Sequence, residues 1–204
     1  MRLLSSLGDN VAEITIPEIP AALLRVFDHQ HYAAQFIQGV LRLGRLDNYR
    51  WSQDSRRDET EGRVSLQWNL ANPVYCDRLC VNAYYLLCAS HHDVDRQVIA
   101  KFGSHIVRIA DPRVLLMRIE AAWRQHPLAV GRCIIAPVVY DKNQCLQPTS
   151  GLLPPTEYFY FQKPATFSDE REFRYVLTCT ADAVKLREFG EIPVRSHNQI
   201  CRPK

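Results

Sequence analysis

Two glutamates and an arginine stand at alternate positions in the segment FSDEREFRYVLTC, residues 167–179. The segment predicts a β-strand entered through a charged turn, and side chains two residues apart on a strand point to the same face. Glu170, Glu172 and Arg174 would therefore form a row, with the aromatic and aliphatic residues between them on the other face. Fixed carboxylates can accept protons and can stabilise positive charge during a reaction. The same pattern is also typical of a solvent-facing strand whose carboxylates are offset by arginines.

Two further polar residues lie in strands predicted earlier in the chain. Arg25 lies in the first predicted strand, and Ser90 ends a middle one in the triplet Cys-Ala-Ser. The order Arg25, Ser90, Glu170-x-Glu172 resembles the Arg, Ser, Glu-x-Glu pattern of ADP-ribosyltransferases. The middle triplet departs from the family, which more often has Ser-Thr-Ser at this place.

In that family the arginine holds a phosphate of NAD, and the serine supports the nicotinamide ribose. The last glutamate bonds the ribose 2′-hydroxyl and stabilises an oxocarbenium-like transition state, and the preceding glutamate orients the acceptor. The resemblance therefore implies Glu172 and Glu170 as catalytic residues, and Arg25 and Ser90 as residues that bind NAD. The chemistry agrees with these roles, because positive charge develops on the ribose as nicotinamide leaves and arginine suits a bidentate grip on phosphate.

The resemblance also implies the substrate and the partner. NAD would be consumed as a substrate by a transferase of the glycosyltransferase class, and the acceptor would be a macromolecule, either protein or nucleic acid. The biological role implied is that of a bacterial toxin or defence effector. Tyr32, Tyr49 and Tyr85 could stack on nicotinamide or adenine, although aromatic residues at such positions also pack in cores. The segments HYAAQFIQGVLRLGRLDNYR, DETEG and KPATFSDEREFRYVL further resemble a group of uncharacterised bacterial proteins, which adds no activity.

A non-enzymatic module that binds nucleic acid or protein is the alternative interpretation. Arginines near Tyr49 and Trp51 could form a basic track that takes phosphates while the aromatic rings stack on bases. These arginines are at positions 42, 45, 50, 56, 57 and 63. The charged segment DSRRDETEGR, residues 54–63, is either a solvated loop or a recognition loop that flanks a site.

Metal and phosphate-loop chemistry are disfavoured by the sequence. The doublet His92-Asp93 follows a predicted strand, where adjacent side chains point to opposite faces, so capping and solvent contact are the preferred roles. Cys76 and Cys80 lack an obvious second pair of zinc ligands. The glycine segment at residues 39–46 lacks the lysine and the hydroxyl of a phosphate loop. No metal site is therefore predicted.

The pattern of strands and helices favours a single α+β domain over residues 1–204. We expect a mixed, mostly antiparallel sheet with a few flanking helices, similar to ADP-ribosyltransferases. Strands are predicted at residues 22–28, 40–46, 64–70, 79–90, 104–110, 132–140, 158–164 and 172–179. Helices are predicted at residues 29–38, 93–103 and 111–127, with Asp28 and Asp111 as N-caps and Gly39 as a C-terminal stop. The tail is expected to be less regular.

Composition points to a reducing, cytoplasmic environment. The chain has 204 residues, a formal net charge of +3 and seven cysteines without a regular framework. The N-terminal segment lacks the apolar core of a signal peptide, and no apolar run is long enough to cross a bilayer. The small net charge neither requires nor excludes a nucleic-acid partner.

Overall fold

The structure is a computed structural model, and it describes residues 18–45, 63–67, 75–79, 84–127, 129–140, 145–146, 160–179, 189–194 and 201–203. Tyr49, Trp51 and most of the charged segment at residues 54–63 lie outside these ranges. Among the helices in the described ranges, none is long and apolar enough to span a membrane.

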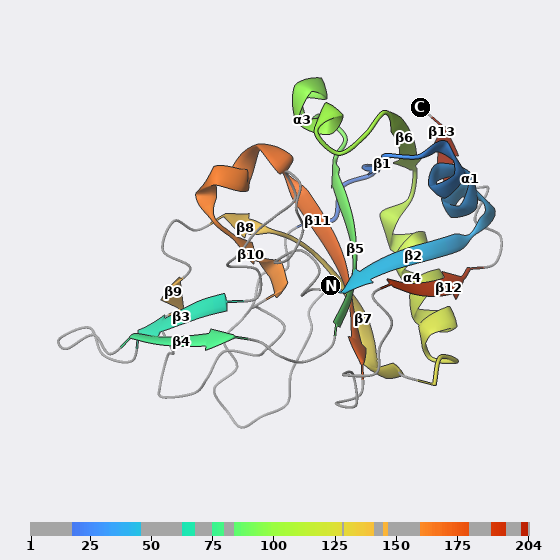
Figure 1. Ribbon diagram of the computed structural model, residues 1–204. Helices are drawn as coiled ribbons and strands as arrows, with labels where there is room; N and C mark the ends of the chain where they lie inside the picture. Colours follow the sequence, from blue (N-terminus) through green and yellow to red (C-terminus); the bar gives the residue numbers. More distant parts are fainter. Residues whose placement is uncertain are drawn as a thin grey trace.

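An eight-stranded sheet forms the centre of the molecule (Figure 1). Its strand order is β12-β2-β5-β1-β6-β13, and β11 pairs with both β5 and β7. Every pairing in this sheet is antiparallel. The strands are β1 (Leu23–Phe27), β2 (Val40–Arg45), β5 (Tyr84–His91), β6 (His105–Ile109), β7 (Ala129–Pro137), β11 (Glu172–Cys179), β12 (Phe189–Pro193) and β13 (Cys201–Pro203).

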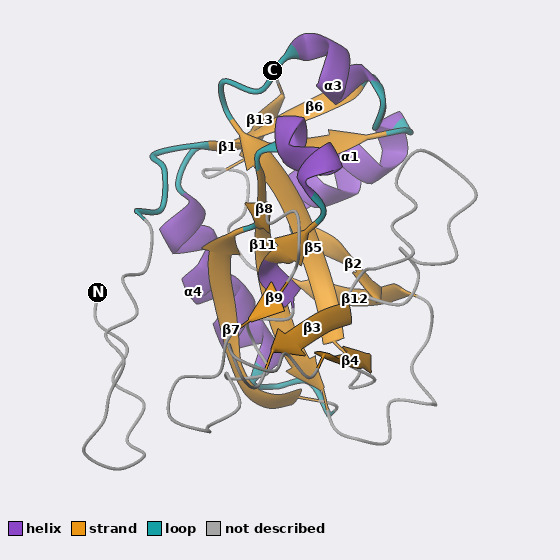
Figure 2. Cartoon of the chain, turned by 90° about the vertical axis from the view of Figure 1, so that its left-hand side faces the viewer, coloured by secondary structure: helices purple, strands orange, loops and turns teal. Residues whose placement is uncertain are grey.

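Two small sheets lie beside the main one on the side away from α4 (Figures 1 and 2). One has three strands, β3 (Arg63–Gln67), β4 (Tyr75–Leu79) and β9 (Cys145–Leu146). The other is the short parallel pair of β8 (Val139–Tyr140) and β10 (Gln162–Lys163). The short pair leads directly into the segment that carries the two glutamates.

Helices cover both faces of the main sheet. The helical elements are α1 (Gln30–Gln38), α3 (Arg96–Ala100), α4 (Pro112–Trp123) and the 3-10 helix η3 (Ala165–Glu170). Helices α1 and α4 pack on one face, where Phe36 and Trp123 join alternate residues of β5 and β11 in the largest core cluster. Helix α3 packs on the other face through Val98 and Ile99, which contact Leu24. Glu172 and Arg174 alternate with the core residues of β11, so they belong to the second face.

Two local signals in the sequence set the ends of the helices as predicted. Asp111 caps α4, where its carboxylate accepts hydrogen bonds from the backbone N–H groups of Arg113 and Val114. Gly39 ends α1 in the left-handed region with φ of 94°. The N-cap of α1 is His29 rather than Asp28, and no side chain caps this end.

Replacing Asp111 by alanine should lower the free energy of unfolding by about 1 kcal/mol, because two backbone N–H groups would lose their capping acceptor. Urea denaturation followed by circular dichroism measures the change. Asp28→Ala is the matched control, since Asp28 is exposed and makes no cap; it should stay within about 0.5 kcal/mol of the wild type. An equal loss in both variants would contradict the capping role of Asp111.

The expectation of an α+β fold with a mostly antiparallel sheet and a few helices is confirmed. Three local predictions are corrected. The segment 158–164 is not one strand, because Tyr160 and Phe161 lie in a 3-10 turn and, of its described residues, Gln162–Lys163 form a strand. Strand β4 precedes β5 as a separate element. The tail contributes β12 and β13, which add to the two ends of the ordered sheet path.

Candidate functional site

A cavity of about 110 Å³ lies where β1 and β5 separate from each other. The two strands pair only through Leu23 and Leu24, opposite His91 and Ser90. Earlier along the same edge, β5 pairs with β2 at residues 85–86. Within the described part of the chain, residues 87–89 of β5 therefore have no strand partner on this edge. The cavity is lined by Leu24, Arg25, Val26, Cys88, Ala89, Ser90, Phe102, Lys163, Glu170 and Glu172.

The side chain of Arg25 lies in this gap in the sheet. One of its terminal nitrogens, Nη1, donates a hydrogen bond to the backbone carbonyl of Cys88. Its Nε is buried and has no hydrogen-bond partner among the described residues. A buried donor without a partner costs about 1–3 kcal/mol. Arg25 therefore lines the cavity with a guanidinium that has one unsatisfied donor.

A tight turn, rather than strand alternation, brings the two glutamates together. Glu170 is the last residue of η3, and Arg171 follows it in the left-handed region with φ of 44°. The Arg171 carbonyl accepts a hydrogen bond from the backbone N–H of His91, and its guanidinium lies 2.6 Å from a carboxylate oxygen of Asp93. Glu172 then begins β11. The end of the neighbouring strand β5 and the residues after it therefore hold the turn between Glu170 and Glu172.

The backbone of Glu172 is also held on its other side. Its N–H donates to the hydroxyl oxygen of Tyr140 at 2.8 Å, and its carbonyl accepts from the N–H of Val138 at 2.8 Å. Both partners come from the segment around β8. Glu172 is therefore fixed between β5, β8 and the end of β7.

The two carboxylates belong to a buried ionic cluster. Lys163 Nζ lies 2.7 Å from Glu170 Oε2 and 2.8 Å from Glu172 Oε2. Arg174 Nε donates to Glu172 Oε1 at 2.9 Å, and Arg174 Nη1 donates to the carbonyl of Tyr160 at 2.6 Å. Glu172 is 5% exposed and Arg174 is 1% exposed. This burial excludes the interpretation of a solvent-facing charged strand.

The environments of the two glutamates shift their pKa values in opposite directions. Burial alone would raise the pKa of Glu172, but the charges of Arg174 and Lys163 and their hydrogen bonds hold it well below its usual value. For Glu170, burial raises the pKa, and the nearby charge of Glu172 adds to this while Lys163 opposes it. When two paired carboxylates have separated pKa values, the one with the lower pKa can stay charged while the other takes part in proton transfer.

Cys88 contributes a protonated thiol to the same site. Burial, followed by the negative charge of Glu172, raises the pKa of this thiol to about 12. The thiol and the Glu172 carboxylate are hydrogen-bonded, so the thiol is the donor. A thiol with this pKa is a poor nucleophile near neutral pH. Cys88 therefore orients Glu172 at the position where the sequence pattern of the resembled family has a serine.

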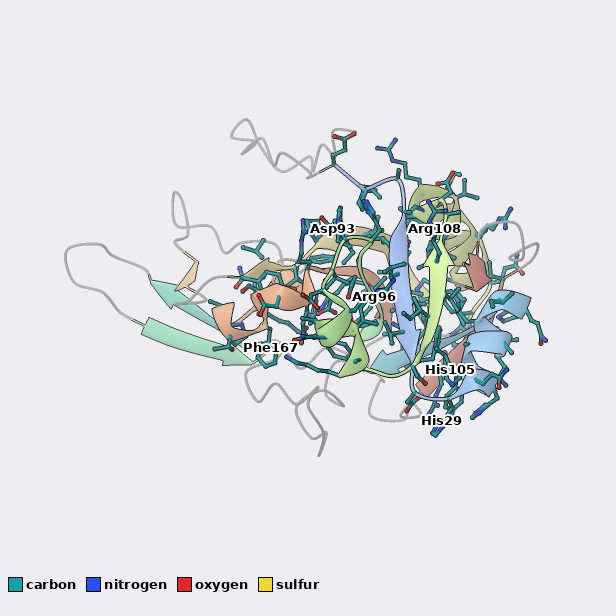
Figure 3. The ribbon with its side chains drawn as sticks, turned by 90° about the horizontal axis from the view of Figure 1, so that it is seen from above. His29, Asp93, Arg96, His105, Arg108 and Phe167 are labelled. Atoms are coloured by element: carbon teal, nitrogen blue, oxygen red, sulfur yellow. The ribbon has the colours of Figure 1, made fainter. Side chains whose placement is uncertain are left out.

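Four of the six site residues predicted from the sequence line the cavity together: Arg25, Ser90, Glu170 and Glu172. Tyr49 lies outside the described residues. Tyr32 does not line the cavity. It lies in α1, where it packs against the core cluster of the other face, and the guanidinium carbon of Arg42 is 4.5 Å from its ring centroid. Figure 3 shows the corresponding separation, with His29 at the start of α1 far from Phe167 of η3.

The structure also describes two further residues that were named from the sequence, Tyr85 and Asp93. Tyr85 is 2% exposed in the core and makes an edge contact with Trp123, with ring centroids 6.2 Å apart. Asp93 pairs with His91 and Arg171. The described ranges contain no group of three or more residues arranged to hold a metal ion.

Sequence reasoning missed Lys163, which contacts both glutamates. One signal for it was present: the lysine follows the aromatic run YFYF in the segment YFYFQKP. Lysine is almost never fully buried unless it is paired. A lysine in an apolar segment that folds into the core therefore requires a carboxylate, although the sequence does not show which one.

The comparisons with known proteins give no relative from which a role for these residues could be transferred. No protein-family model, no curated protein and no solved structure matches the chain.

Proposed function

We propose that the protein is a cytoplasmic, NAD-dependent ADP-ribosyltransferase with an ADP-ribosyltransferase-like fold. It would break the bond between nicotinamide and ribose C1′ and transfer ADP-ribose to a protein or nucleic acid. One observation carries the proposal: Arg25, Ser90, Glu170 and Glu172, which lie far apart in the sequence, line one cavity. A role as a bacterial toxin or defence effector belongs to the same proposal.

Glu172 would stabilise the transition state electrostatically. Nicotinamide leaves with the electron pair of the broken bond, so positive charge develops on the ribose. The carboxylate of Glu172 is ionised, buried and fixed by Lys163, Arg174 and Cys88. A group that is already in place needs no reorganisation when the charge appears, which makes its effect larger than that of a mobile carboxylate.

Glu170 would act on the acceptor. A lone pair of the acceptor forms the new bond to C1′, and the acceptor proton must go to a base. Burial raises the pKa of Glu170, so this carboxylate is the better proton acceptor of the two. The step then balances: nicotinamide leaves, the acceptor atom is bonded to ribose, and Glu170 holds the proton.

Arg25 would hold a phosphate of NAD. Its guanidinium has a buried Nε without a partner in the described ranges, and its Nη1 is bonded to the Cys88 carbonyl. The cavity of about 110 Å³ is smaller than the roughly 300–1,000 Å³ of pockets for drug-sized ligands. The cavity must therefore widen to take a dinucleotide. As part of that change, Arg25 would give up its hydrogen bond to the Cys88 carbonyl and bind a phosphate oxygen instead.

Replacing Arg25 by lysine should raise the KM for NAD about tenfold with a smaller effect on kcat. Lysine keeps the charge but loses the fork of donors that matches phosphate. Nicotinamide release measured over a range of NAD concentrations gives both constants. Arg108→Lys is the matched control, because Arg108 is an exposed arginine of the neighbouring strand β6 and lies outside the cavity. Equal KM values for the two variants would contradict the phosphate role of Arg25.

The proposal itself is tested by incubation of the wild-type protein with NAD labelled in its adenine moiety, together with a cell lysate. Nicotinamide should be released, and the label should become covalently attached to protein or nucleic acid. Digestion of the product with protease or nuclease identifies the acceptor class. Wild-type protein that consumes no NAD and labels no macromolecule would overturn the proposal.

A non-enzymatic binding module is the second candidate, and the charge balance of the cluster favours it. Glu170 and Glu172 are matched by Lys163 and Arg174, an arrangement that a purely structural network would also have. In such a module, changes in the cluster would affect stability and ligand binding, and no NAD would be consumed. The incubation with labelled NAD distinguishes the two functions.

A further inference from the structure

A single lysine stands between the two glutamates of the cavity. Lys163 is 6% exposed, and its ammonium contacts Glu170 at 2.7 Å and Glu172 at 2.8 Å through one oxygen of each carboxylate. The ammonium also lies 5.1 Å from the ring centroid of Phe167. Burial of an ammonium costs several kcal/mol unless it is paired, so these contacts fix where the ammonium can be.

The position of Lys163 is set by the same strand that fixes Glu172. Strand β10 pairs with β8 so that Lys163 lies opposite Tyr140. The Tyr140 hydroxyl accepts the hydrogen bond from the backbone N–H of Glu172. One short strand pair therefore holds both the lysine and the carboxylate that it contacts, which makes their separation a feature of the fold.

We propose that Lys163 is a positioning residue that serves as the shared counter-ion of Glu170 and Glu172 and thereby keeps Glu170 ionised, ready to take a proton from the acceptor. This inference rests on the proposed function. Two neighbouring carboxylates in a buried site do not both stay ionised without a cation, because each raises the pKa of the other. Glu172 has Arg174 as a second cation, so loss of Lys163 would place the proton on Glu170.

Other charged and titratable groups also face Glu170. Glu172 and Arg174 come from β11, Tyr140 comes from β8, and Arg25 of β1 lines the same cavity. Helix α3 contacts η3, and its two capping residues, Asp95 and Lys101, line a second hollow with Asp169 and Arg171, which does not include Glu170. All of these groups remain when Lys163 alone is replaced, so a change in the titration of Glu170 would report the ammonium.

Lys163→Met tests the inference through the pH dependence of transfer. Glu170 must be deprotonated to act as a base, so activity falls as pH decreases through its pKa. Without the ammonium that pKa should rise, and the acid limb of the pH profile should move to higher pH by about one unit or more. Lys163→Arg keeps the charge and should leave the limb close to its wild-type position. Lys101→Met makes the same substitution at an exposed lysine and should leave the limb unchanged.

A purely structural role for Lys163 predicts a different result. Activity would then fall by the same factor at every pH, and the acid limb would not move. That outcome, in a Lys163→Met protein whose circular dichroism spectrum matches the wild type, would overturn the inference. If Lys163→Met does not fold, Lys163→Gln replaces it, because the shorter glutamine keeps a hydrogen-bond donor near this position and removes the charge.

A titration without NAD separates this inference from the proposed function. Carbon-13 labelling of the glutamate carboxyl groups gives the pKa of Glu170 by NMR, with the signal assigned through Glu170→Gln. A wild-type protein that consumes no NAD would overturn the transferase proposal, yet the Glu170 signal should still titrate at higher pH in Lys163→Met. If the wild-type protein does consume NAD but the Glu170 signal titrates at the same pH in Lys163→Met as in the wild type, only the role of Lys163 would be overturned.

Discussion

Replacing Glu172 by glutamine should lower both nicotinamide release and ADP-ribose transfer at least about a hundredfold, which corresponds to roughly 3 kcal/mol of transition-state stabilisation. Glutamine keeps the volume and the hydrogen-bonding reach of the side chain but removes its negative charge. In the wild type that charge is fixed in the cavity by Arg174 and Lys163. The loss should appear in kcat, because the positive charge on the ribose develops only as the bond breaks.

Nicotinamide release at saturating NAD measures this effect, and calorimetric titration shows whether the variant still binds NAD. Glu120→Gln is the matched control, since Glu120 pairs with Arg124 on the surface of α4 and lies outside the cavity. Glu172→Gln will also be less stable, because it leaves two buried cations with less compensating charge. Assays must therefore be made below the melting temperature of the variant. A folded variant with wild-type kcat would show that Glu172 is not the electrostatic residue.

The elements that depend on local signals could be predicted from the sequence. Strand β11 has the bounds expected from its alternation, and α4 begins after the expected Asp111 cap with Pro112 in its first turn. Helix α1 ends at Gly39, as expected. In each case the information lies within a few residues of the element, in its hydrophobic period or its capping residue.

The contacts that form the cavity could not be predicted in this way. Arg25 and Cys88 are 63 positions apart, and they meet only because β1 diverges from β5 after two paired residues. The order Arg25, Ser90, Glu170-x-Glu172 suggested that these residues share a site, but not that the site is a gap in a sheet. Strand divergence depends on packing between distant segments, for which the sequence has no local pattern.

The segment between Lys163 and Glu172 illustrates the same limit. The aromatic run before it favours a strand, yet the chain forms a two-residue strand and a 3-10 helix. Lys163 contacts two carboxylates here, and a buried ammonium without such partners would be costly. Glu170 pairs with Lys163, seven residues earlier, across the change from strand β10 to the 3-10 helix η3, so the period of a single element does not predict this contact.

Replacing Arg174 by methionine should have the largest effect on stability, a loss of about 3 kcal/mol in the free energy of unfolding near pH 8. Arg174 is 1% exposed, contacts both oxygens of Glu172 and donates to the Tyr160 carbonyl. Methionine fills a similar volume but leaves the carboxylate of Glu172 in the core with less compensating charge. The expected loss is at the lower end of the range for broken buried pairs, because Lys163 still contacts Glu172.

Guanidinium denaturation measures this loss, and the double variant Glu172→Gln/Arg174→Met is its control. Removing both members of a buried ion pair is often close to neutral, whereas removing one leaves an uncompensated charge. The double variant should therefore be more stable than the sum of the two single losses predicts, by a coupling energy of about 1–3 kcal/mol. Additive losses would mean that Arg174 stabilises the fold through its Tyr160 contact and its packing rather than through Glu172.

Glu172 should affect the pH dependence of the unfolding free energy differently in the wild type and in Arg174→Met, which provides a further test of the pairing. In the wild type the pKa of Glu172 is lowered on folding, so the unfolded chain binds more protons than the folded one. Glu172 therefore contributes stability above its unfolded pKa of about 4.3, and this stability is lost as pH falls. In Arg174→Met the burial of Glu172 prevails and raises its pKa on folding, so the folded variant binds more protons and this contribution weakens as pH rises. The difference in unfolding free energy between wild type and variant should therefore grow from pH 5 to pH 8. A difference that is constant over this range would show that the charge of Glu172 is not what Arg174 compensates.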